Sequence, residues 1–190
     1  MKICIISDSH DNRAYLLSAV TAAKEKGAEA VLHCGDVVAP STLGVLQPLG
    51  LPIHVIHGNN TGDLHMMTRI ASKPDKLVHY YGQDAGIKLD GKRIFIVHYP
   101  HYARAIATTG EWDLVCYGHD HQALLESVPN MKGTDTILLN PGTVAGIEAR
   151  PTYAIGDLDT LKFTLHEVEQ PQQGPALPDV EGEQLGFHNL

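Results

Sequence analysis

The first 75 residues alternate short β-rich apolar runs with segments of helical apolar spacing, and this order constrains the fold most. Residues 2–7 form a β-rich run, and residues 11–26 follow with apolar side chains at helical spacing that ends before Gly27. The same order continues with a strand at 31–34, a short helix at 40–49, a strand at 53–56 and a helix at 63–72. Such alternation predicts parallel strands joined by helical crossovers, and therefore an α/β fold.

The second half of the chain is richer in short strands. We expect one helix, at 101–109, and strands at 77–81, 87–89, 93–97, 114–117, 123–128, 136–139, 153–157 and 162–168. So many strands predict two stacked mixed β-sheets with helices outside them. A chain of 190 residues fits one domain, which we expect at 1–168. The segment 169–190 contains several prolines and glycines and lacks periodicity, so it is expected to be a tail.

Charge, apolar length and cysteine spacing exclude several classes of protein. The net charge of −8 comes without a basic cluster, so we expect no long nucleic acid as partner. No apolar stretch approaches the ~20 residues that span a bilayer, so no membrane partner is expected. No signal-peptide layout precedes the first strand, and the expected location is cytoplasmic. Cys4, Cys34 and Cys116 lie in or beside apolar runs without close spacing, which favours buried thiols over disulfides or a zinc knuckle.

Five short polar motifs each follow an apolar run of the chain. They are Asp8-Ser9-His10, Gly35-Asp36, Gly58-Asn59-Asn60, His98, and Gly118-His119-Asp120-His121. Loops at the carboxyl ends of strands gather at one edge of an open α/β sheet, so these motifs can meet although they are far apart in sequence. Each motif alone is also typical of an ordinary turn or of a chance pair. Together they supply carboxylates, an amide and imidazoles, the mixture that a two-metal hydrolytic site uses.

The order Asp-x-His, Gly-Asp, Gly-Asn, His, Gly-His-x-His resembles that of the calcineurin-like metallophosphoesterases. The short length and Asn60 are similar to the small bacterial and archaeal phosphodiesterase branch of that family. The resemblance covers residue 1 to about residue 168, and it implies a four-layer αββα sandwich with a dinuclear metal site. It implies one ion held by Asp8, His10, Asp36 and His121, and a second held by Asp36, Asn59, His98 and His119, with Asp36 as the bridge.

The implied cofactors are two divalent transition-metal ions. Nitrogen and oxygen ligands without thiolate suit Mn, Fe, Ni, Co or Zn better than Mg or Ca, and Mn is the first expectation. In the implied mechanism, a bridging hydroxide attacks phosphorus in line with the leaving oxygen. Two dications outweigh the charge of Asp8, Asp36 and the hydroxide, so the site attracts phosphate despite the acidic body. The expected activity is metal-dependent hydrolysis of small phosphodiesters, in which Asn59 also donates its amide N–H to a phosphate oxygen.

Two departures from the family pattern bear on the chemistry. Many relatives have His at the position of Asn60, where it assists the leaving group, and an amide cannot act as a general acid. Leaving groups of low pKa are therefore expected to react best. Tyr99-Pro100 follows His98 where relatives often have Gly, so Tyr99 either narrows the pocket or packs in the core. His101 either replaces the missing acid or lies at the surface, and the loop 140–143 either borders the site or is a plain Pro-Gly turn.

Other functions stay open at this point. The phosphoesterase-fold subunit of the retromer coat shows that this fold can serve as a protein-interaction scaffold with lost or weakened catalysis. Asn60 favours that alternative, whereas the complete set of ligands favours an enzyme. A nuclease component is disfavoured by the acidic net charge and by the lack of the extra domains found in larger relatives. Monoester hydrolysis, and a homo-oligomer held together through the tail, are further alternatives.

Overall fold

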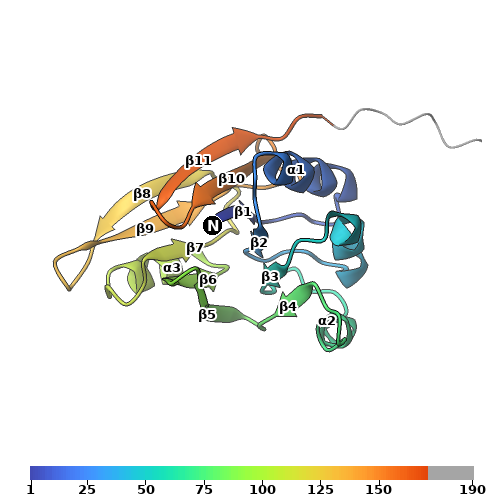
Figure 1. The fold of residues 1–190 in the computed structure, drawn as a ribbon, viewed down its shortest axis with the longest axis horizontal. Helices are drawn as coiled ribbons and strands as arrows, with labels where there is room; N and C mark the ends of the chain where they lie inside the picture. Colours follow the sequence, from blue (N-terminus) through green and yellow to red (C-terminus); the bar gives the residue numbers. More distant parts are fainter. Residues whose placement is uncertain (171–190) are drawn as a thin grey trace, which may run out of the picture.

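Two β-sheets pack face to face between helices in the computed structural model, which describes residues 1–170 (Figure 1). The six-stranded sheet consists, in spatial order, of β11 (Lys162–Glu167), β10 (Thr152–Asp157), β1 (Lys2–Ile6), β2 (Ala30–His33), β3 (Ile53–Val55) and β4 (Val78–Tyr80). The five-stranded sheet consists of β5 (Asp84–Leu89), β6 (Lys92–Val97), β7 (Leu114–Cys116), β9 (Asp135–Asn140) and β8 (Leu124–Pro129). Residues 171–190 of the expected tail lie outside the described residues.

Both sheets are mixed. Strands β1 to β4 run parallel, as the alternation of the first 75 residues predicts for β1 to β3, and β10 and β11 add an antiparallel pair of strands beside β1. In the other sheet, β6, β7 and β9 run parallel between the antiparallel edge strands β5 and β8. The predicted α/β fold with two mixed sheets and flanking helices is confirmed.

Helices cover the two outer faces of the sheets, which gives four layers in the order αββα. The α-helices α1 (Arg13–Glu25) and α2 (Leu64–Ala71) and the 3₁₀ helix η1 (Pro40–Leu49) cover the six-stranded sheet, and α3 (Pro100–Ala107) covers the five-stranded sheet (Figure 1). Ile3 and Ile5 of β1 belong to the apolar cluster between the sheets, whereas Cys4 and Ile6 belong to the cluster beneath α1. This alternation buries both faces of the strand, and all three cysteines are buried and free.

Two helices differ from those expected. The segment 40–49 is a 3₁₀ helix with Pro48 in its interior, and Gly50 ends it in the left-handed conformation at a φ of 68°. The helix expected from His101 begins one residue earlier, at Pro100, where the missing amide hydrogen has no intrahelical partner to lose. Within residues 1–170, no helix is both long enough and apolar enough to cross a membrane.

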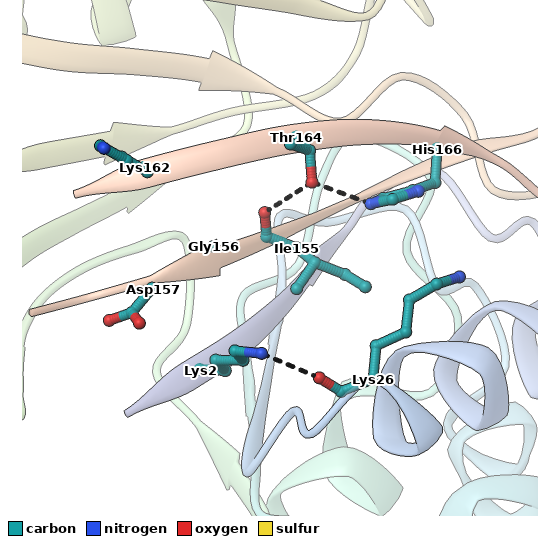
Figure 2. A pocket seen from close by; sticks show the side chains of 8 residues that line it. All are labelled: Lys2, Lys26, Ile155, Gly156, Asp157, Lys162, Thr164 and His166. Carbon is teal, nitrogen blue, oxygen red and sulfur yellow. Dashed lines mark hydrogen bonds between the residues drawn. The ribbon is translucent and has the colours of Figure 1, made fainter. Parts of the chain in front are cut away.

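A groove of about 260 Å³ lies on the outer face of the six-stranded sheet, beside the end of α1 (Figure 2). Lys2, Lys26 and Lys162 contribute to its lining, and the Lys2 ammonium donates a 3.3 Å hydrogen bond to the carbonyl oxygen of Lys26. Because Lys2 is the first residue of β1, the groove lies at the amino end of that strand. It is therefore separate from the carboxyl end, which leads to Asp8.

Candidate active site

The seven predicted ligands follow strands of both sheets and meet where those strands end. From the six-stranded sheet, β1 leads to Asp8 and His10, β2 leads to Asp36, and β3 leads to Asn59. From the five-stranded sheet, β6 leads to His98, and β7 leads to His119 and His121. Contacts of 4.0 Å or less connect all seven side chains, so the candidate site spans the two sheets.

The Asp8 carboxylate lies at the centre of the cluster. Its Oδ1 atom is 3.5 Å from Nε2 of His121, 3.9 Å from Nε2 of His10 and 4.0 Å from Nε2 of His98. The side chain is fully buried, Oδ2 accepts a 3.1 Å hydrogen bond from the backbone N–H of His119, and Oδ1 accepts none from residues 1–170. Burial raises the pKa of Asp8, because the charged form loses solvation. An unpartnered buried carboxylate oxygen facing three imidazole nitrogens fits a metal cation.

The two oxygens of Asp36 face different parts of the cluster. Oδ1 is 3.4 Å from Nε2 of His98, and Oδ2 is 3.7 Å from Nε2 of His10. Asn60 donates its backbone N–H to Oδ1 at 2.9 Å and its side-chain N–H to Oδ2 at 2.6 Å. Burial favours the neutral acid, but the hydrogen bonds from His98 and Asn60 outweigh it and hold the pKa of Asp36 below its usual value. Asp36 is therefore placed to connect two groups of ligands.

The Asn59 side chain connects the imidazole of His119 to the cluster. Its Oδ1 atom lies 3.0 Å from Nε2 of His98 and 2.8 Å from Nδ1 of His119. Among the described residues, two sets offer potential ligand atoms that lie within 4.8 Å of one another inside each set: Asp8, His10 and His121, and Asp8, Asp36 and His98. Asp8 belongs to both sets, a sharing that the sequence did not predict, since only Asp36 is expected as a bridge.

Two histidines are oriented by backbone carbonyl groups. Nδ1 of His98 donates to the carbonyl oxygen of Cys34 at 2.9 Å, and Nδ1 of His121 donates to that of Ile147 at 3.1 Å. A carbonyl oxygen only accepts, so each bond places a proton on Nδ1 and points Nε2 toward the carboxylates. Nε2 of His10 and Nε2 of His121 lie 3.4 Å apart beside Asp8. Such a convergence of acceptors fits a divalent cation.

The backbone of the loops that carry the candidate ligands is strained. The candidate ligands with positive φ are Asp8 at 53°, His10 at 38°, Asp36 at 56°, His119 at 79° and His121 at 58°. Residues other than glycine rarely adopt this region, and where they do so in a cluster the strain commonly accompanies a functional site.

Two glycines allow the ligands to approach closely. A Cβ atom at Gly58 would overlap a carboxylate oxygen of Asp36, and a Cβ atom at Gly118 would lie 2.6 Å from Oδ2 of Asp8. The glycines of the predicted motifs therefore make room for the carboxylates.

The structure shows where the loop 140–143, Tyr99 and His101 lie relative to the candidate ligands. The loop 140–143 borders the site, because the hydroxyl of Thr143 donates to the carbonyl oxygen of Asp8 at 3.1 Å. The Tyr99 ring contacts the cluster, with its centroid 5.4 Å from that of His98 and 4.9 Å from that of His119. His101 is exposed and lies beyond Tyr99, at a centroid distance of 5.8 Å from it.

Sequence reasoning missed the groups that hold the ligands in place. The carbonyl groups of Cys34 and Ile147 carry no signal in the residue type, because every residue has one. The contact between Asn60 and Asp36 was also missed, although the amide side chain directly after Asn59 was a visible hint.

Comparisons with known proteins agree with one another. The calcineurin-like phosphoesterase superfamily domain matches residues 1–161. A phosphodiesterase of Methanocaldococcus jannaschii is 29% identical over 171 residues, which covers 88% of this chain and 98% of the relative. A solved archaeal phosphodiesterase has a TM-score of 0.78 and 25% identity, covering 88% of this chain and 99% of that chain.

More distant structures share the fold. YfcE, a phosphoesterase of E. coli, has a TM-score of 0.60 at 17% identity and covers 89% of this chain and 100% of its own. Vps29 of Entamoeba histolytica, solved with Zn²⁺, has a TM-score of 0.58 at 18% identity and covers 88% of this chain and 91% of its own. The domain match covers most of the sequence, and the chain therefore belongs to the calcineurin-like phosphoesterase superfamily.

Proposed function

We propose that this protein is a metal-dependent phosphodiesterase that hydrolyses small phosphodiesters. The observation that carries the proposal is the buried, unpartnered Oδ1 atom of Asp8, which faces three imidazole nitrogens. The phosphodiesterase of M. jannaschii, similar along nearly its whole length, supports a diester rather than a monoester substrate.

The proposed cofactors are two divalent ions, with Mn first and Fe, Ni, Co or Zn as alternatives. Carboxylate, amide and imidazole ligands without thiolate support this choice. The proposed ligands are those implied by the family pattern: Asp8, His10, Asp36, Asn59, His98, His119 and His121. Two divalent ions bound together supply a hydroxide nucleophile at neutral pH and neutralise charge on the phosphoryl oxygens.

The side chains of this protein would then position the reactants. His98 and His121 would present Nε2 to an ion, because their Nδ1 atoms donate to the carbonyl oxygens of Cys34 and Ile147 and so orient the rings. Asn59 is proposed to donate its amide N–H to a phosphate oxygen. Asn60 holds Asp36 through two hydrogen bonds and has no proton to give to a leaving alkoxide, so leaving groups of low pKa are favoured.

The free cysteines and the net charge of the protein support a proposal for its location in the cell and for its partners. Three buried free thiols are compatible with a reducing compartment, and we place the protein in the cytoplasm. Its proposed partner is a small phosphodiester. Its net charge of −8 disfavours long nucleic acid, whose binding depends on basic residues.

The proposal is tested by loading the protein with one kind of metal at a time and comparing the hydrolysis of two substrates. Protein loaded with Mn²⁺ is expected to hydrolyse bis-p-nitrophenyl phosphate faster than p-nitrophenyl phosphate, and to contain bound metal by elemental analysis. His121→Ala is expected to lower kcat at least 100-fold, because it removes a proposed ligand that is oriented by a backbone carbonyl group. His65→Ala, which changes an exposed histidine of α2, serves as the matched control. Retained activity in His121→Ala would contradict the ligand assignment.

A protein-interaction scaffold is the second candidate function. The fold likeness to Vps29 and the Asn60 substitution favour it. Absence of both hydrolysis and bound metal with every metal tested would support the scaffold and contradict the enzyme.

A further inference from the structure

A groove of about 200 Å³ lies between α3 and the edge strand β5, over the outer face of β6. Phe95 and Val97 of β6 form its floor, and Tyr102 and Ile106 of α3 form one side. Tyr99, which immediately precedes α3, also lines it. We call this feature the Tyr99–Tyr102 groove, and its walls are mainly aromatic and aliphatic.

The Tyr99 ring lies between the Tyr99–Tyr102 groove and the candidate active site. The centroid of this ring lies 4.9 Å from that of His119, an exposed ligand candidate, and 6.0 Å from that of Tyr102. Tyr102 is 50% exposed and packs beside His101 at a centroid distance of 4.2 Å. A substituent that extends from a phosphate group near His119 would therefore meet the Tyr99 ring first and then enter the groove.

The charge of the groove limits the kind of substituent. Gln83 and Asp84, where β5 begins, form the side opposite α3. The Asp84 carboxylate would repel a second phosphate or a carboxylate. Flat faces of Tyr99 and Tyr102 instead favour a planar ring, because aromatic pairs gain more than their buried area alone.

We propose that the Tyr99–Tyr102 groove binds the uncharged aromatic ring of the ester group that stays on phosphorus during hydrolysis. The substrates would then be small phosphodiesters with an aromatic substituent. This inference rests on the proposed function, because it requires the phosphate to lie at the candidate metal ligands. It also answers the question about Tyr99, which contacts the site and borders the groove instead of packing in the core.

Two diesters with the same leaving group test the proposal. Phenyl p-nitrophenyl phosphate and methyl p-nitrophenyl phosphate both react with water to release p-nitrophenolate, which takes the electrons of the broken P–O bond, and they leave phenyl phosphate or methyl phosphate. In the Mn²⁺-loaded protein, Tyr102→Ala is expected to lower kcat/KM for the phenyl diester roughly tenfold. The methyl diester should change less than about twofold, since a methyl group does not reach the groove.

Control variants separate ring stacking from other effects. Tyr102→Leu keeps an apolar side chain but removes the flat face, and it should lose most of the preference for the phenyl diester. Leu125→Ala, a similarly exposed apolar residue on β8, should preserve the preference. Metal content should equal that of the unsubstituted protein in all three variants, because none of them is a ligand candidate.

Binding of the products gives a readout that does not depend on turnover. Calorimetry should show that phenyl phosphate binds roughly tenfold more tightly than methyl phosphate, and that Tyr102→Ala removes the difference. Equal binding of the two products, or an equal loss for both diesters in Tyr102→Ala, would overturn the inference. If the loaded protein hydrolysed neither diester, the proposed function would be wrong, and the calorimetric comparison would still decide the role of the groove.

Discussion

Asn60 is a side chain that holds a carboxylate without the capacity to transfer a proton. The backbone N–H of Asn60 donates to Oδ1 of Asp36 at 2.9 Å and the side-chain N–H donates to Oδ2 at 2.6 Å, and together they orient that carboxylate. An amide does not protonate a departing alkoxide at neutral pH. In the proposed reaction the leaving group therefore departs as an anion, which is easier when the pKa of its conjugate acid is low.

We expect the rate for a series of aryl phosphodiesters to fall steeply as the pKa of the leaving phenol rises. Asn60→Ala should keep this slope and weaken metal binding about tenfold, because Asp36 loses a side-chain donor. Steady-state kinetics and metal titration measure the two effects, with exposed Gln122→Ala as the control. A slope that is flat in the unsubstituted protein, or steeper in Asn60→Ala, would contradict this role.

His54, which is not one of the proposed metal ligands, makes the free energy of unfolding depend on pH. Burial lowers its pKa to about 4, Nδ1 contacts the Tyr81 hydroxyl at 2.7 Å, and the ring stacks on His79. Between pH 6.5 and about 4 the unfolded chain binds a proton that the folded chain excludes. The free energy of unfolding should therefore fall as the pH decreases through this window.

His54→Gln removes the titrating group and keeps a hydrogen-bonding side chain. From pH 7 to pH 5 in the presence of a chelator, the loss of unfolding free energy should be about 1–2 kcal/mol smaller in this variant, after allowance for partial exposure. Urea denaturation at the two pH values measures the difference. An identical loss in both proteins would show that His54 is not the source.

At the scale of elements, the turn after β3 packs closely against the proposed ligands Asp36 and His98. Gly58→Ala would push a methyl group into the Asp36 carboxylate and to within 2.7 Å of Nε2 of His98. We expect a loss of metal and at least a 100-fold loss of kcat in this variant. Gly44→Ala, in η1, would place its methyl group more than 4 Å from the atoms it could meet in the described part of the chain, and it is the matched control. Wild-type metal content in Gly58→Ala would contradict the close packing of this turn.

Helix α3 depends on small residues for its contact with the five-stranded sheet. Ala103 and Ala107 are fully buried against a cluster that includes Val115 and Leu138. Ala103→Leu should lower the free energy of unfolding by about 1–3 kcal/mol, because the added atoms have no space. Exposed Ala105→Leu should have little effect in the same denaturation experiment, and equal effects of both changes would argue against the packing.

Most elements could be predicted because their signals are local. The helical spacing of α1 and the apolar runs of β1, β2 and β3 are visible in short windows of sequence. The position of β10 beside β1 could not be read in this way, because residues 2–5 pair with residues 154–157, far along the chain. The same holds for the site: the ligands carry residue-type signals, whereas the positive φ of Asp8 and its contacts with three imidazoles arise only in the folded chain.

At the scale of the whole molecule, the site connects the two sheets, so metal removal should lower global stability. Without a cation, Asp8 keeps a buried and unpartnered oxygen beside Asp36. We expect chelation to lower Tm by several degrees and Mn²⁺ to restore it, because a ligand that binds only the folded state stabilises it. Differential scanning calorimetry measures the shift. His121→Ala should show a much smaller one, and an unchanged Tm in the unsubstituted protein would speak against a resident metal.

The pairing of β1 with β10 has a consequence for the growing chain on the ribosome. One edge of β1 pairs with β2, which is synthesised soon after it, but the other edge finds its partner only when residues 152–157 have emerged. Until then the nascent protein presents an open apolar strand edge, the kind of surface that joins other chains. Slow translation between β4 and β10 would prolong this exposure, so aggregation during synthesis should depend on the speed of the ribosome along that stretch.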